Sequence, residues 1–170
     1  AVFPLAGTTG LLVNETDSQV WLVATSAGLF RSEDGGCSFS PADTPFDTVP
    51  LAGIWRHPIN GQLLVMTAHR VENNQGYLSN HDGRIWQRLD ADLPPGIRQV
   101  HWHPQDPSQL IVLGATEAMM RRIGPPEFTP LSFQTDGLGL GAEFVTDLVV
   151  APLERGAPVV VALGHGRAPS

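Results

Sequence analysis

The chain has 170 residues, of which 42% are hydrophobic and 16% charged, so it is long and apolar enough to bury the core of one domain. Ten cations, all of them arginines, oppose seventeen carboxylates for a net charge of −7, which argues against a partner with a phosphate backbone. No apolar stretch approaches the roughly 18 to 20 residues that a membrane helix needs. Eighteen glycines and fifteen prolines argue against a helical bundle and favour short strands joined by turns.

Pairs of apolar segments along the chain predict pairs of strands. In chain order they cover residues 11–13 and 20–25, 51–56 and 63–67, 97–102 and 109–113, and 144–151 and 159–163. A His-Pro turn joins the second pair at His57 and the third at His103, which is 46 residues further along the chain. A fixed offset of this kind predicts a structural repeat.

The segments after the first two pairs are also alike. Residues 28–32 and 76–79 each predict a third strand, which is followed by a tight turn and by an aromatic residue, Phe39 or Trp86, that begins a fourth strand. In the third unit Pro125-Pro126 replaces this turn. Four short strands in about 46 residues, repeated, are typical of a β-propeller blade.

We therefore predict an all-β fold: a partial β-propeller of about three and a half four-stranded antiparallel blades. The whole chain, 1–170, is expected to form a single and incomplete propeller domain, with approximate blades at residues 1–48, 49–94, 95–143 and 144–170. A two-layer β-sandwich of eight to ten strands is the alternative, because strand counting alone does not exclude it.

The turns after the third strands resemble the Asp-box (BNR) repeat, Ser-x-Asp-x-Gly-x-Thr-Trp. The matching residues are Ser32, Asp34, Gly36 and Phe39 in the first turn, and Ser79, Asp82, Gly83 and Trp86 in the second. In the second turn His81 stands at the aspartate position and Asp82 comes one residue later. The resemblance implies blades like those of sortilin, xyloglucanases and Ycf48-type photosystem assembly factors. It also implies that these residues fasten the turn and are not catalytic.

No combination of residues predicts a catalytic site. Sialidases with this repeat use an arginine triad and a tyrosine nucleophile, whereas the single tyrosine, Tyr77, falls at a packing position. Xyloglucanase-type enzymes use two carboxylates, and no spacing selects a pair among Asp17, Asp106, Asp136 and Asp147. We predict no cofactor. We also predict no metal, since His101 and His103 are better explained by the His-Pro repeat and a lone Cys37 cannot build a thiolate site.

The glycine-rich segment 137–141 is better explained as a connection between blades than as a phosphate loop. Three and a half blades leave two open faces, which the remainder of a longer chain, a protein partner or a homo-oligomer that closes the ring would cover.

The favoured function is a non-catalytic protein-interaction scaffold, a subunit or assembly factor of a larger complex. The alternative is a glycan-binding or glycoside-hydrolase propeller, in which Trp55 and Trp102 stack on sugar rings. The candidate contact residues for either ligand are Trp55, Arg56, Arg98 and Trp102. The family resemblance implies a periplasmic or secreted protein, and neither nucleic acid nor a transmembrane segment is expected.

Overall fold

The computed structural model describes residues 7–46, 48–80, 82–89, 93–103, 106 and 108–115, and the backbone of four later strands. All paired strands are antiparallel, and the residues described here contain no helix. Among them, accordingly, there is no helix with the length and hydropathy needed to cross a membrane. The chain divides into two compact units, residues 1–69 with 73–93 and residues 70–72 with 94–170.

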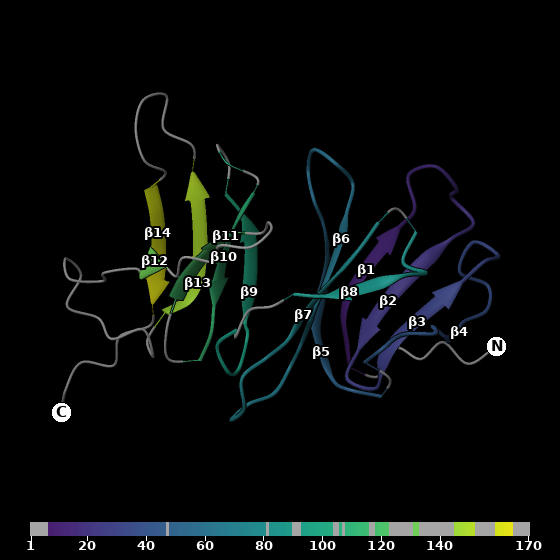
Figure 1. Ribbon diagram of the computed structural model, residues 1–170, viewed down its shortest axis with the longest axis horizontal. Coiled ribbons are helices and arrows are strands. Elements are labelled where there is room, and N and C mark those ends of the chain that lie inside the picture. Colours follow the sequence, from purple (N-terminus) through teal and green to yellow (C-terminus); the bar gives the residue numbers. More distant parts are fainter. Residues whose placement is uncertain are drawn as a thin grey trace. The chain divides into compact units, whose positions relative to one another are not determined.

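The first unit contains two four-stranded sheets in which the strands follow one another in chain order (Figure 1). The first sheet consists of β1 (Thr8–Val13), β2 (Trp21–Thr25), β3 (Gly28–Ser32) and β4 (Ser40–Pro41). The second consists of β5 (Leu51–Arg56), β6 (Leu63–Thr67), β7 (Gly76–Ser79) and β8 (Trp86–Arg88).

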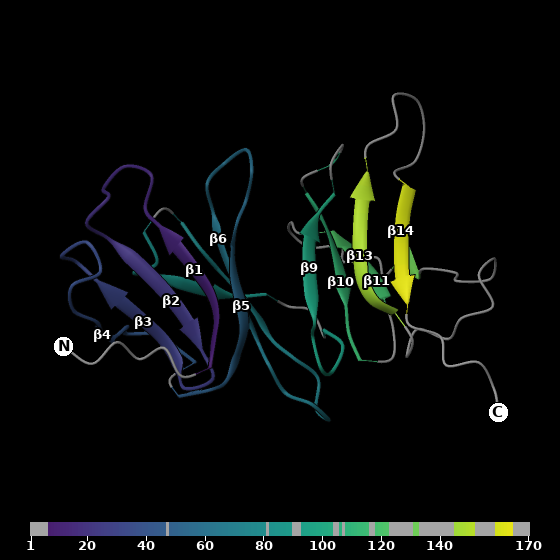
Figure 2. The same ribbon diagram turned by 180° about the vertical axis from the view of Figure 1, so that it is seen from behind.

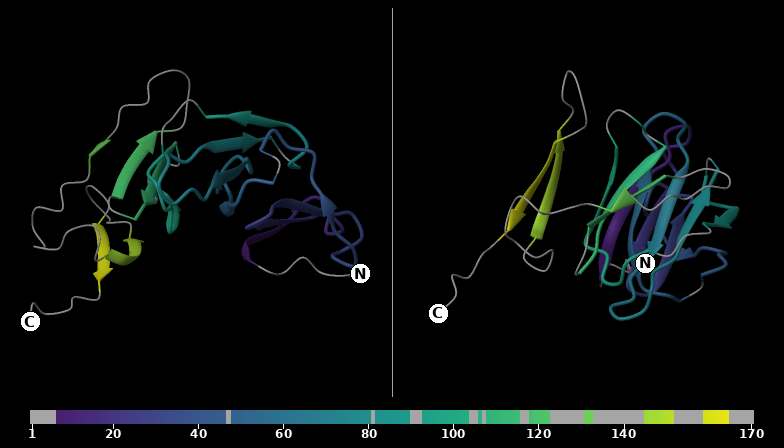
Figure 3. Two further views of the ribbon diagram at one scale, coloured as in Figure 1. Left: turned by 90° about the horizontal axis from the view of Figure 1, so that it is seen from below. Right: turned by 60° about the vertical axis from the view of Figure 1, so that its left-hand side comes forward.

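The second unit begins with a third four-stranded sheet of the same order. Its strands are β9 (Gln99–Trp102), β10 (Gln109–Leu113), β11 (Ala118–Arg122) and β12 (Leu131–Ser132). A two-stranded sheet follows, formed by β13 (Val145–Ala151) and β14 (Val159–Gly164), and Figure 3 shows these strands side by side. Three sheets of four strands and one of two strands match the predicted three and a half blades. The predicted blade boundaries themselves stay a prediction.

The 46-residue repeat is visible in the hydrogen bonds of the two His-Pro turns. The His57 amide donates to the Gln62 carbonyl over 2.7 Å, and the His103 amide donates to the Gln109 carbonyl over 2.9 Å. Both imidazoles are buried, and in both the Nδ1 atom accepts from the backbone of its own turn. The two stretches therefore occupy equivalent settings, as the sequence offset predicted.

The core of the first unit lies between its two sheets. Two alternate residues of β2 and one residue of β3 contribute from the first sheet, and residues of β5, β6 and β7 contribute from the second. The members are Leu22, Ala24, Leu29, Phe46, Leu51, Ile54, Leu63, Val65 and Tyr77. Phe46, on the segment that connects the sheets, packs against Tyr77 and meets the edge of Trp86 with ring centroids 5.4 Å apart. Burial of such aromatic side chains stabilises by about 2 to 3 kcal/mol each.

The inner strands of the two sheets, β1 and β5, lie side by side (Figure 2). A Cβ atom on Gly10 would lie 2.9 Å from the backbone nitrogen of Ile54, closer than real Cβ contacts allow. Glycine is therefore required where the two backbones approach each other. Both strands carry a register shift at the matching place, between Thr8 and Gly10 and between Leu51 and Gly53.

Candidate interaction surface at the outer turns of the first two sheets

The turn after β3 is closed by its own side chains. The Ser32 hydroxyl donates to Asp34 Oδ1 over 2.7 Å and accepts from the Gly36 amide over 2.9 Å. The Asp34 carboxylate in turn accepts from the Ser38 amide and the Ser38 hydroxyl. Gly36 has a φ of 85°, which residues with a side chain rarely adopt. The geometry makes Asp34 a turn-closing acceptor.

These hydrogen bonds favour the ionised form of the Asp34 carboxyl. Donation from the Ser38 hydroxyl is the largest cause, followed by the Ser38 amide and the Ser32 hydroxyl, and together they lower the pKa of Asp34 from 3.8 to about 2. Asp34 is therefore negatively charged at neutral pH.

The turn after β7 keeps the same spacing from its serine to its glycine and its aromatic residue, but it has a different internal structure. Gly83, with a φ of 73°, takes the place of Gly36, and the Trp86 indole donates to the Gly83 carbonyl over 3.0 Å. The Asp82 carboxylate, displaced by one residue, accepts from the Arg84 amide and pairs with Arg84 Nε at 2.8 Å. The Ser79 hydroxyl is buried and has no hydrogen-bond partner in the part of the chain that the structure describes. His81, at the aspartate position, lies outside the described residues.

The displaced aspartate belongs to a polar network that joins the two turns. Arg31 of β3 donates from Nη1 to the Asp82 carbonyl over 2.5 Å and from Nε to Glu33 over 3.1 Å. Glu33 also pairs with Arg84, from the other sheet, at 3.1 Å. The Arg31 side chain is 11% exposed, whereas Arg84 and Glu33 are each 62% exposed. Arg31 therefore carries most of the buried contact between the turns.

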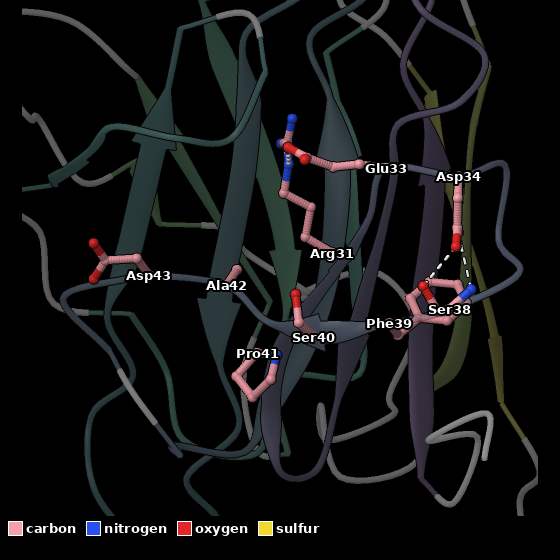
Figure 4. A pocket seen from close by; sticks show the side chains of 9 residues that line it. All are labelled: Arg31, Glu33, Asp34, Ser38, Phe39, Ser40, Pro41, Ala42 and Asp43. Carbon is pink, nitrogen blue, oxygen red and sulfur yellow. Dashed lines mark hydrogen bonds and ion pairs between the residues drawn. The ribbon is translucent and has the colours of Figure 1, made fainter. Parts of the chain in front are cut away.

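Two adjoining hollows lie along the outer edge of the first sheet, on either side of the segment 41–43. The acidic hollow, of about 440 Å³, is lined by Arg31, Glu33, Asp34, Ser38, Phe39, Ser40, Pro41, Ala42 and Asp43 (Figure 4). The apolar hollow, of about 450 Å³, is lined by Ala27, Gly28, Leu29, Phe30, Pro41, Ala42, Asp43, Thr44 and Thr48. Each has the size of a site for a side chain or a small ligand. In Figure 4 the carboxylates of Asp34 and Asp43 stand on opposite sides of Ser40 and Pro41.

The four predicted contact residues fall into two pairs, one in each unit. In the first unit Arg56 is 16% exposed, pairs with Glu15 at 2.6 Å and donates to the Val13 carbonyl, so it ties the second sheet to the first. Trp55 is half-buried beside Gly53. In the second unit Arg98 is exposed just before β9, and Trp102 lies half-buried within it.

The candidate carboxylates that the structure describes hold turns. Asp17 accepts from the Gln19 amide, and Asp106 accepts from the backbone and hydroxyl of Ser108 and from the side chain of Gln109. Within the described ranges no three His, Cys, Asp or Glu side chains come together as metal ligands. Asp136, the Asp147 side chain, the glycine-rich segment 137–141 and Pro125-Pro126 lie outside the described residues.

Sequence reasoning did not single out Arg31, Glu33, Arg84 or Asp43. The only local signal was the alternation of Arg31 and Glu33 around Ser32, which is common on exposed strands. The contacts that matter join residues 51 positions apart, and a single sequence contains no local pattern for such pairs.

No family model and no curated protein matches the chain. Solved structures share its fold at low sequence identity. An ancestral GH74 enzyme matches with a TM-score of 0.56 and 17% identity, over 71% of this chain and 19% of that one. The GH74 enzyme of Niastella koreensis matches with a TM-score of 0.56 and 16% identity, over 75% of this chain and 22% of that one. Ycf48 from Cyanidioschyzon merolae matches with a TM-score of 0.53 and 14% identity, over 99% of this chain and 59% of that one.

These solved structures are β-propeller proteins, so the likeness confirms the predicted fold class. The chain is an all-β partial propeller of about three and a half antiparallel blades, and the sandwich alternative is wrong. It spans less than two thirds of the length of each of these structures.

Proposed function

We propose that the chain is a non-catalytic protein-interaction scaffold, a subunit or assembly factor of a larger extracytoplasmic complex, built on Asp-box blades. One observation carries the proposal: the ionisable side chains of the outer turns hold the fold together, while the hollows beside them stay open. Asp34 closes its own turn, and Arg31 and Glu33 join neighbouring turns. A rigid frame with open edge hollows suits the recognition of another protein.

The Asp-box part of the proposal rests on the first turn. Its serine, aspartate and glycine form a closed set of hydrogen bonds at Ser32, Asp34 and Gly36. In the second turn Ser79, Gly83 and Trp86 keep the same spacing. The extracytoplasmic location rests on this resemblance alone.

Crosslinking of the full chain in its native cells, followed by mass spectrometry, tests the scaffold function. We expect crosslinks to a defined protein at constant stoichiometry, and we expect the chain to be recovered in the extracytoplasmic fraction. A chain that crosslinks to no protein while it hydrolyses or binds a polysaccharide would overturn the proposal.

The glycan-binding alternative has one specific observation in its favour. Trp55 in β5 and Trp102 in β9 are both half-buried, although they do not match within the repeat, since Trp55 comes two residues before His57 and Trp102 one residue before His103. A partly exposed tryptophan ring is a suitable platform for a sugar. Binding on a glycan microarray that Trp55→Ala abolishes, with Trp21→Ala as the control on the first sheet, would favour this alternative.

A further inference from the structure

The acidic and apolar hollows share the segment 41–43 and so adjoin along one edge of the first sheet. We propose that together they form a docking groove for an extended cationic segment of a partner protein, with an arginine or lysine in the acidic hollow and an apolar side chain in the apolar hollow. The inference rests on the proposed scaffold function, because it names the chemistry of the partner.

The charges of the acidic hollow favour a cation. Three carboxylates line it, from Glu33, Asp34 and Asp43, against the single cation of Arg31. That guanidinium is already engaged by Glu33 and by the Asp82 carbonyl. Glu33 is itself paired with Arg31 and Arg84, so an incoming cation meets the charges of Asp34 and Asp43.

Asp43 is the carboxylate most available to a partner. It is exposed, it lines both hollows, and it has no hydrogen bond or ion pair within the described parts of the chain. Asp34 contributes a permanent negative charge, because its turn keeps its pKa at about 2. The net charge of −7 adds long-range attraction for a basic partner.

The apolar hollow supplies the adjoining contact. Leu29, Phe30 and Ala42 form its apolar wall. Thr48 closes it in a left-handed conformation, with a φ of 60°, next to Gly28, where a Cβ atom would lie 3.3 Å from the Thr48 nitrogen. A short apolar side chain next to a basic one fits this pair of hollows.

The edge itself does not favour recognition by strand addition. The outermost strand, β4, has two residues, and Pro41, opposite Phe30, has no amide hydrogen to donate. Proline and short length are the features by which natural edge strands avoid further pairing. Recognition at this groove must therefore use side chains.

The test is the binding of a labelled peptide, acetyl-Arg-Leu-Arg-Leu-Arg-amide, to the full chain by fluorescence anisotropy. The control peptide replaces each arginine with citrulline, which keeps the shape and removes the charge. We expect saturable binding that is at least about tenfold weaker for the citrulline peptide and that weakens as salt is raised.

Two variants place the binding in the groove. Asp43→Asn should weaken binding about three- to tenfold, whereas Glu72→Gln, which removes the same charge from an exposed position outside both hollows, should leave it unchanged. Ala42→Arg should abolish binding, because it places a cation where the two hollows meet. Equal binding of both peptides, or equal effects of Asp43→Asn and Glu72→Gln on binding, would overturn the proposal that the two hollows form a docking groove.

The same variants separate the groove from the scaffold function. If the wild-type chain and Asp43→Asn crosslink equally to the native partner and the peptide does not bind, the groove is wrong and the scaffold function stands. If the wild-type chain crosslinks to no protein, the scaffold function fails, and saturable peptide binding would still show a cationic site.

Discussion

Ser32 and Ser79 occupy the same position in two successive turns, and each is 1% exposed, but among the residues that the structure describes only the Ser32 hydroxyl finds a hydrogen-bond partner. Ser32 donates to Asp34 two residues later. In the second turn the carboxylate comes three residues after the serine, at Asp82, and pairs with Arg84. Displacement by one residue thus converts a turn-closing acceptor into one arm of a network between sheets.

This difference predicts opposite effects for the same substitution. Ser32→Ala should lower the free energy of unfolding by about 1 to 2 kcal/mol, because it removes three hydrogen bonds and leaves the amides of Asp34 and Gly36 without this acceptor. Ser79→Ala should be neutral or slightly stabilising, since it removes a buried hydroxyl that has no partner among the described residues. Urea denaturation followed by tryptophan fluorescence measures both, and equal losses would contradict the assignment.

Asp34 predicts a stability difference that depends on pH. Its folded-state pKa, about 2, lies below the usual 3.8, so the ionised form stabilises the fold. The advantage of the wild type over Asp34→Asn should be complete above pH 3.8 and should disappear as the pH falls towards 2. Urea denaturation of both proteins between pH 2 and 6 measures this difference, and a difference that stays constant over that range would disprove the prediction.

The network between the turns predicts that its two arginines contribute unequally to the free energy of unfolding. Arg31→Ala should lower the free energy of unfolding by about 1 to 2 kcal/mol, because the buried side chain bonds both Glu33 and the Asp82 carbonyl. Arg84→Ala should cost less than about 0.5 kcal/mol, since its ion pairs are exposed. A double-mutant cycle of Arg31 and Glu33 gives their coupling. The prediction fails if the two single alanine variants are equally stable.

The His-Pro turns predict that stability depends on a hydrogen-bond acceptor at the histidine position, which a side chain other than imidazole can also supply. In the second sheet His57 Nδ1 accepts from the amides of Ile59 and Asn60. His57→Ala should therefore lower the free energy of unfolding by about 1 to 2 kcal/mol. His57→Asn should recover much of that loss, because the asparagine Oδ1 reaches the position of Nδ1. Thermal unfolding of these variants and of the matching His103 pair checks the repeat, and asparagine variants no better than alanine would refute it.

The close approach of β1 to β5 predicts that Gly10 does not tolerate a side chain. Gly10→Ala should cost about 1 to 3 kcal/mol, because the new methyl group meets the backbone nitrogen of Ile54 at 2.9 Å. Gly61→Asn is the control: no atom lies within 4 Å of a Cβ built there, and asparagine tolerates its φ of 71°. Denaturation midpoints measure both. If the Gly61 variant is the less stable one, the close approach is not the cause.

The sequence determined the features that depend on local patterns. Alternating apolar residues and turn residues located the strands, and the distance of 46 residues from His57 to His103 predicted that each four-stranded unit repeats. Hairpin pairing between neighbouring strands follows from such patterns, because the turn brings adjacent segments together.

Only the tertiary structure decided which side chains make contact between neighbouring sheets and which sheet edge stays uncovered. The structure pairs Arg56, which the sequence nominated as a partner contact, with Glu15 of the first sheet, and it connects Arg31 to Asp82, 51 residues away. A contact between Arg56 and a partner stays a prediction. The structure also showed that Asp43 borders two hollows at a sheet edge. Such contacts depend on how one sheet packs against the next and on where an edge is left uncovered, and no spacing within a single strand or turn encodes either.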